Sequence, residues 1–282
     1  MFPVPIQKRP LINQISYKIL IPISLLIWLV PLIGIMLTSI RGLGDISQGN
    51  LWGVPSEFLL FSNLKDVFTN TPMISYIINS FKITIPTMIG AVALSCMTGF
   101  ALASYKFKAN LFIFFTFIAG NFVPFQILMI PVRDLTFQMG LYDTVTGLVL
   151  FHVAFQTGFC TLFMRNFIKA LPSELFEAAR MDGTSEFNIF LKIVLPLTRP
   201  AIAALCVLIF TFIWNDYFWA IVLTQGPDTQ PVTAGITAFN SQYRAAYHMM
   251  SAGSIVAAIP PVFMFFLMQK HFIAGLTLGA VK

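Results

Sequence analysis

Residues 19–40 form a run of 22 without a charged side chain, and most of them are apolar. About 20 apolar residues in a helix cross the hydrocarbon core of a bilayer. Inside lipid a helix satisfies its own backbone hydrogen bonds, which an exposed loop or an open sheet edge cannot do. The whole chain is 57% hydrophobic and only 10% charged, whereas a soluble domain carries about 25% charged residues. The sequence therefore predicts an all-helical (all-α) membrane protein.

Further apolar stretches predict a polytopic protein with six transmembrane helices. A secretory signal has a short apolar core, whereas the first stretch is long enough for a full span, so we expect it to stay as an uncleaved first span. The predicted spans are residues 19–40, 73–104, 111–132, 145–164, 200–223 and 249–268.

The distribution of Lys and Arg predicts the orientation of these spans. Six spans place both termini on one side, and twelve Lys and Arg then lie on that side against four on the other. Because cationic loops stay in the cytoplasm, we expect both termini and the loop 165–199 to be cytoplasmic. The expected parts are 1–72 (cytoplasmic N-terminus, first span and external loop), 73–268 (a core of five spans containing the loop 165–199) and 269–282 (a cytoplasmic tail).

The loop 165–199 holds nine of the 28 charged residues of the chain. Glu174–Asp182 is predicted to form a short helix, with Ser173 as its N-cap and Gly183 at the left-handed position that ends it. Glu177 and Arg180, three residues apart, could form a weak pair worth a few tenths of a kcal/mol. A helix of about nine residues is unstable alone in water, so this helix must pack on its own subunit or in a groove of a partner.

The residues of this loop match a known signature. Glu177-Ala178-Ala179, three residues, Gly183, nine residues and then Ile193-Val194-Leu195-Pro196 resembles the EAA signature of permease subunits in binding-protein-dependent ABC importers. Trp214-Asn215-Asp216 and the ending 269–282 are similar to carbohydrate-importer permeases of the maltose-transporter second-subunit type. The resemblance covers residues 10–282 and implies the ABC type I importer permease fold in a bacterial cytoplasmic (inner) membrane.

The resemblance also implies partners and contact residues. It implies a second permease subunit, two copies of a cytoplasmic ATPase subunit, which bind the ATP and Mg, and an extracytoplasmic sugar-binding protein that delivers a carbohydrate. This chain would be non-catalytic and hold no cofactor; it contains no G-x-x-x-x-G-K-[ST] phosphate loop. The implied ATPase-coupling residues are Glu177, Ala178, Ala179, Asp182 and Gly183. The implied contacts of the C-terminal tail are Gly275, Gly279 and Lys282.

Asp216 is the one acidic residue inside a predicted span. Ionisable groups in membranes are costly and usually face a cavity or a partner. Beside it, Trp214, Asn215 and Tyr217 offer stacking surface and hydrogen bonds suited to sugar hydroxyls, so all four are substrate-pathway candidates. The alternative is that they hold helices together or anchor the outer interface. Weaker candidates of the same kind are His152, Gln156, Asn121 and Gln126.

Other functions have less support. A permease for a polyol, glycerol phosphate or osmolyte stays open within the same family. A membrane-embedded aspartyl protease would need its two acidic motifs inside spans, yet Gly42-Leu43-Gly44-Asp45 and Tyr142-Asp143 fall in predicted loops. The three cysteines and three histidines show no metal-ligand spacing. A secondary transporter would carry an internal repeat and its own coupling-ion site, and the sequence shows neither. The net charge of +6 is explained by orientation and does not indicate nucleic acid.

Overall fold

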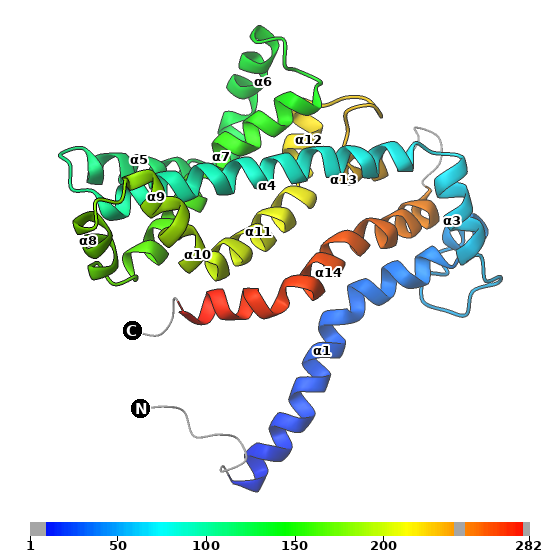
Figure 1. The fold of residues 1–282 in the computed structure, drawn as a ribbon. Coiled ribbons are helices and arrows are strands. Elements are labelled where there is room, and N and C mark those ends of the chain that lie inside the picture. Colours follow the sequence, from blue (N-terminus) through cyan, green and yellow to red (C-terminus); the bar gives the residue numbers. More distant parts are fainter. Residues whose placement is uncertain (1–9, 240–245, 279–282) are drawn as a thin grey trace. The chain divides into compact units, whose positions relative to one another are not determined.

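The computed structural model describes residues 10–239 and 246–278, and every regular element in that part of the chain is a helix (Figure 1). Four helices are each long and apolar enough to cross a membrane, and two bent helix pairs raise the number to six if each pair is one span. The four are α1 (Leu11–Ser39), α4 (Met73–Ser104), α7 (Val145–Lys169) and α14 (Tyr247–Leu278). The prediction of an all-helical, polytopic protein is confirmed, and the side on which the termini lie stays a prediction.

The chain divides into two compact units. The first is built from residues 1–71 and 239–256, and contains α1, α2 (Leu43–Ser47), α3 (Leu60–Thr69) and the start of α14. The second is built from residues 72–238 and 257–282 and contains all the remaining helices. The division of the sequence at residues 72 and 268 that we predicted is not tested by these units.

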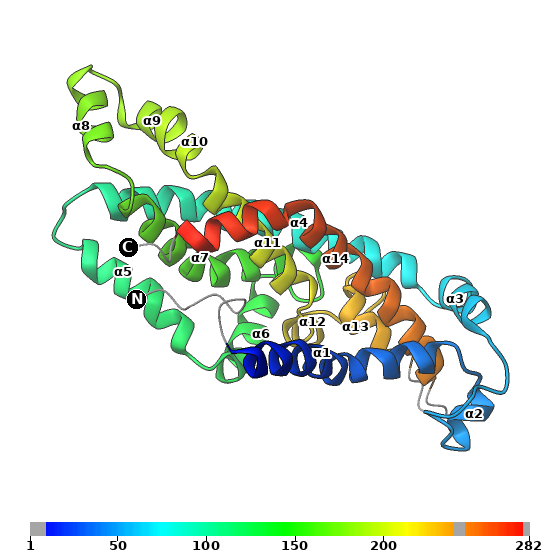
Figure 2. The same ribbon diagram turned by 90° about the horizontal axis from the view of Figure 1, so that it is seen from below.

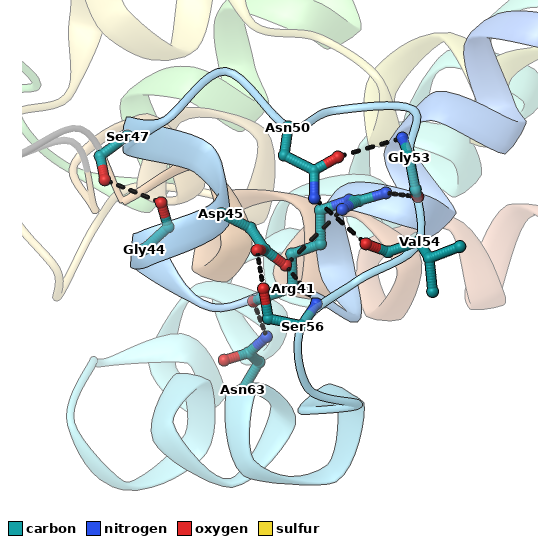
Figure 3. Close-up of polar contacts among 9 residues, drawn as sticks. All are labelled: Arg41, Gly44, Asp45, Ser47, Asn50, Gly53, Val54, Ser56 and Asn63. Atoms are coloured by element: carbon teal, nitrogen blue, oxygen red, sulfur yellow. Dashed lines mark hydrogen bonds and ion pairs between the residues drawn. The ribbon is translucent and has the colours of Figure 1, made fainter.

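A buried ion pair organises the loop of the first unit (Figure 3). Arg41 is fully buried; its Nη2 donates to the carbonyl of Gly53 at 2.5 Å, and its Nη1 lies 3.6 Å from Asp45 Oδ2. Asp45 also accepts hydrogen bonds from the amide and the hydroxyl of Ser56. Asn63 donates to the carbonyls of Ser39 and Arg41. The loop between α2 and α3 is thus held by polar contacts around one buried cation.

Replacing Asp45 by asparagine is expected to loosen this loop, because Arg41 would stay buried without its counter-charge. The Ser56 hydrogen bonds, with Arg41 nearby, lower the pKa of Asp45 below its ordinary value of 3.8. The stabilisation is therefore present above that ordinary value and lost as the pH falls through the lowered one. At neutral pH, hydrogen exchange of residues 42–58 should be roughly tenfold faster in Asp45→Asn. Ser47→Ala, which removes an exposed hydroxyl bonded only to Gly44, is the matched control; equal exchange in both variants would contradict the prediction.

The core of the second unit forms between α4 and α7, which run side by side in Figures 1 and 2. Gly99 permits their close approach, since a Cβ there would lie 2.9 Å from Met164 Cβ and 3.0 Å from the Arg165 amide nitrogen. Nearby, the hydroxyls of Thr98 and Thr161 lie 2.7 Å apart across the two helices. Small residues and interhelical hydrogen bonds are the usual means of joining membrane helices.

Two predicted spans prove to be broken. The third contains α5 (Asn110–Phe122), a 3-10 turn at Phe125–Leu128 and α6 (Met129–Gln138), with a bend of 90°. The fifth contains α11 (Arg199–Trp214) and α12 (Phe218–Leu223), interrupted at residues 215–217. The predicted spans 111–132 and 200–223 each contain two helices with a break between them rather than one continuous helix. Pro124 follows the end of α5 and cannot donate a helical hydrogen bond, whereas the second break has no proline.

Short helices form the loop 165–199. They are α8 (Glu174–Met181), α9 (Glu186–Ile189), a π-helical turn at Phe190–Val194 and α10 (Leu195–Leu197), and they group near the end of α7 in Figures 1 and 2. The π-helical turn ends two residues before Pro196, which has no amide hydrogen for the helical ladder. The last helix of this unit before α14 is α13 (Val232–Thr237).

Candidate functional site

The short helix α8 is fixed by one apolar face. Phe176 and Ala179 are buried, and the Phe176 ring meets the ring of Phe100 from α4 edge-on, with centroids 6.4 Å apart. The Phe190 ring of the π-helical turn lies against the same Phe100, with centroids 5.6 Å apart. Both arms of the loop therefore pack on the end of α4. The sequence left open whether the helix packs on its own subunit or on a partner, and this face packs on its own subunit.

Arg180 connects α8 to the next arm of the loop. Its guanidinium donates to both carboxylate oxygens of Glu186, at 2.7 and 3.3 Å. The Tyr105 hydroxyl donates to Glu186 at 2.6 Å, and burial together with this bond raises the pKa of Tyr105 to about 12. The predicted Glu177–Arg180 pair was wrong. Glu186, which the fold brings close, accepts two hydrogen bonds from Arg180, whereas Glu177 accepts none.

Gly183 ends α8 in the left-handed conformation, with φ of +73°. Its amide donates to the carbonyl of Arg180 at 3.0 Å, and the Thr184 amide donates to the carbonyl of Ala179 at 3.0 Å. The prediction that Gly183 terminates the helix is confirmed. Ser185 then caps α9 by accepting from the Asn188 amide, while Ser173 precedes α8 without a side-chain cap.

Four of the five predicted coupling residues are exposed, and one is buried. Glu177, Ala178, Asp182 and Gly183 are exposed, and Ala179 is buried against the subunit. Small residues at Ala178 and Gly183 leave the backbone of α8 open to close approach. For the predicted tail contacts, Gly275 falls within α14, and Gly279 and Lys282 lie outside the described residues.

The break between α11 and α12 is organised by Asp216. Its carboxylate accepts from the amides of Trp219 at 3.4 Å and Ala220 at 3.0 Å, which satisfies the start of α12. Its own carbonyl accepts from the Thr233 hydroxyl of α13. Asp216 thus holds the broken segment in place while its side chain stays partly accessible.

His152 of α7 faces this carboxylate. The ring is buried, with a 2% exposed fraction, and Nε2 lies 3.5 Å from Asp216 Oδ2 without hydrogen-bond geometry. Neither ring nitrogen has a hydrogen-bond partner among the described residues. A buried side chain with unused donors and acceptors costs free energy unless something occupies them.

These two residues line a cavity of about 720 Å³. Its other polar lining residues are Asn121, Gln156, Thr211 and Asn215, and most of the remainder are aromatic: Phe125, Phe155, Phe159, Phe212, Tyr217, Phe218 and Trp219. Of the predicted substrate-pathway residues, Asn215, Asp216 and Tyr217 line the cavity together with the weaker candidates His152, Gln156 and Asn121.

Two candidates lie elsewhere. Trp214 is 1% exposed, donates its indole N–H to the carbonyl of Ala257 at 2.9 Å and stacks on Phe210, so it packs in the interior. Gln126 is exposed outside the cavity lining. The aromatic lining was missed because 30 phenylalanines in an apolar chain give no positional signal; the clue available was the polar Asn-Asp pair that interrupts an apolar run.

The known proteins to which this chain is similar are membrane components of transport systems. Residues 91–277 match the family described as binding-protein-dependent transport system inner membrane component. The chain is 33% identical to the osmoprotective compounds uptake permease protein GgtD of Synechocystis, covering 91% of this chain and 88% of that protein. It is 33% identical to the arabinooligosaccharides transport permease AraQ of Halalkalibacterium halodurans (89% and 90% covered). It is 29% identical to the lactose transport permease LacG of Rhizobium radiobacter (98% of each).

A solved structure shares the fold. A chain of a bacterial ABC transporter involved in importing the acidic polysaccharide alginate superposes with a TM-score of 0.77 at 23% identity, covering 93% of this chain and 96% of that one. A structure of the alginate transporter with its pentasaccharide-bound periplasmic protein gives 0.69 at 17% identity, covering 91% and 93%.

Proposed function

We propose that this chain, which belongs to the family of binding-protein-dependent transport system inner membrane components, is the permease subunit of a carbohydrate importer, driven by a partner ATPase docked on α8. One observation carries the proposal: Glu177, Ala178, Asp182 and Gly183 are exposed on a helix whose other face is fixed to α4. Because one face of α8 is exposed to a partner and the other is packed on α4, α8 can transmit a displacement of the ATPase to the membrane helices.

The π-helical turn and α10 connect that surface to the cavity. They lead directly from α9 into α11, whose end at Trp214 precedes the break at Asn215 and Asp216. A movement of α8 would therefore reach the cavity through consecutive short helices, which turn by 74° between Glu186–Leu197 and Arg199–Trp214. Paired with a second permease, this arrangement fits a pathway that opens alternately to each side, loaded by an extracytoplasmic binding protein.

The cavity favours an uncharged carbohydrate as cargo. Aromatic faces and a few hydrogen-bonding groups are a common lining for small-molecule sites. The lining contains Asp216 and no Lys or Arg, so it offers an anionic solute such as glycerol phosphate a carboxylate and no lysine or arginine to pair with. Two of the similar permeases are named for arabinooligosaccharides and lactose. The second candidate, an osmolyte, rests on the similarity to a permease for osmoprotective compounds.

Reconstitution tests the proposal. In proteoliposomes, the chain with its second permease, ATPase and binding protein should take up sugar only with ATP, and the chain alone should neither transport nor hydrolyse ATP. Glu177→Lys should also lose the ATPase during purification. The matched control is Glu174→Lys, the same charge reversal at an exposed position of α8 outside the signature. Transport by the chain alone, or equal loss of ATPase in both variants, would contradict the proposal.

A further inference from the structure

A second cavity lies where α4 ends, α5 begins and α7 ends. Its volume is about 630 Å³, and four of its ten lining residues are cations: Lys106, Lys108, Arg165 and Lys169. No acidic residue lines it. In the sequence these cations indicated only orientation; the fold gathers them from two separate segments around one space.

Arg165 lines this cavity and is the buried member of the four cations. Its side chain is packed with the guanidinium carbon 3.7 Å from the centroid of the Phe114 ring, and its Nε donates to the carbonyl of Leu102 at 3.3 Å. Within the part of the chain that the structure describes, no carboxylate lies within 4.0 Å of any of the four cations. A cation shielded from water without a counter-ion is costly, so an anion bound in this cavity would be stabilised.

Backbone groups around the cavity add to its positive character. The carbonyls of Leu102 and Tyr105, which would otherwise project negative ends from α4, accept from the Asn110 side chain at 3.1 and 2.8 Å. Helix α5 begins at Asn110, whose amide donates to the carbonyl of Phe107 at 3.0 Å, and no side chain caps the next amides of its first turn. The first N–H groups of a helix point outward and attract an anion. Cationic side chains and a helix N-terminus thus converge on the same space.

We infer that this cavity binds the phosphate headgroup of an anionic phospholipid. Basic pockets between membrane helices on the cytoplasmic side are suited to such headgroups, and the charge distribution predicts that side for these loops. The apolar walls favour a lipid over free phosphate: Leu111 is 58% exposed at the cavity and Phe112 beside it is 75% exposed. They offer acyl chains a surface along α5.

The site is linked to α8 through the side chain of Tyr105. Tyr105 lines the cavity and donates to Glu186, which in turn pairs with Arg180 of α8. The binding site itself does not depend on the proposed function, because it rests only on the cavity and its charges.

Native mass spectrometry of the purified full chain tests the inference. Phosphatidylglycerol should be retained in preference to phosphatidylcholine, and the Lys106→Gln/Lys108→Gln variant should bind it about tenfold more weakly. These lysines are chosen because both are exposed, whereas the packed Arg165 is also part of the fold. The control Lys18→Gln/Lys192→Gln removes the same charge from exposed positions elsewhere and should bind as the original chain does.

Three results would overturn the inference. Equal retention of the two lipids would mean that charge does not select the ligand. Equal weakening by both double variants would mean that the net charge of the protein attracts the lipid without a defined site. Displacement of phosphatidylglycerol by millimolar inorganic phosphate, with phosphate alone binding in a Lys106- and Lys108-dependent way, would identify a site for a soluble anion.

Discussion

Replacing Gly183 by valine is expected to abolish sugar uptake while the chain remains in the membrane at normal abundance. Gly183 has a φ of +73°, where a β-branched residue is strongly disfavoured; the left-handed region costs about 1–2 kcal/mol for ordinary residues. A Cβ at this position would meet no atom within 4 Å, so the substitution acts through the backbone. The bond from Thr184 to Ala179 would be lost first, and the exposed surface of α8 would turn away from a docked ATPase.

The measurement is ATP-dependent uptake by the reconstituted transporter, with ATP hydrolysis followed in parallel. Gly140→Val is the matched control: Gly140 has a φ of +67° and also has open space where a Cβ would be placed, but it follows α6 outside the loop. The control should suffer the same strain and keep its uptake. Gly183→Asn separates two explanations, because asparagine tolerates this conformation. If Gly183→Asn recovers uptake, the loss in Gly183→Val comes from backbone geometry. If Gly183→Asn also loses uptake, the partner must contact the backbone at a position without a side chain. Normal uptake in Gly183→Val would contradict the coupling proposal.

The end of α8 could be predicted because its determinants are local. A short run of helix-forming residues, then a glycine and a serine, marks the end of one helix and the start of the next within a few residues. The partner of Arg180 could not be predicted in this way. Glu177 lies at the right spacing for a pair with Arg180. In the fold, however, α9 brings Glu186 next to Arg180, and Glu186 also accepts a hydrogen bond from Tyr105. A pairing rule for isolated helices is overridden when the tertiary fold offers a better-satisfied arrangement.

The six apolar stretches were predictable from hydropathy, whereas the breaks inside two of them were only partly so. Pro124 gave a recognisable signal, because proline lacks the donor that a helix needs. At the second break the helix ends because the Asp216 carboxylate satisfies the first amides of α12, a contact that composition does not reveal. Likewise, counting Lys106, Lys108 and Arg165 gave their predicted side of the membrane but not the cavity that they share.

Asp216→Ala is expected to lower both the thermal stability and the uptake of the transporter. The carboxylate caps α12, and losing a helix cap costs about 1 kcal/mol. It also leaves His152 without the carboxylate that lies 3.5 Å from its Nε2. Asp216→Asn distinguishes these effects, because asparagine is an equally good cap but carries no charge. If Asp216 contacts the sugar, the asparagine variant should keep its stability and still show uptake reduced by about tenfold, the effect of losing roughly 1.4 kcal/mol of interaction.

Asp143→Asn provides the control for this experiment, since Asp143 also accepts a backbone amide, that of Gln225 at 2.8 Å, and lies outside the cavity lining. Substitution there should leave the dependence of uptake on sugar concentration unchanged. If Asp216→Asn behaves like this control, the role of Asp216 is to hold the broken helix and the cavity must select its cargo by its aromatic walls. If instead only the Asp216 variants shift the sugar concentration for half-maximal uptake, the carboxylate has two roles. One group then terminates α11, starts α12 and presents the remaining lone pairs to the solute, which explains why an acid is tolerated within an apolar span.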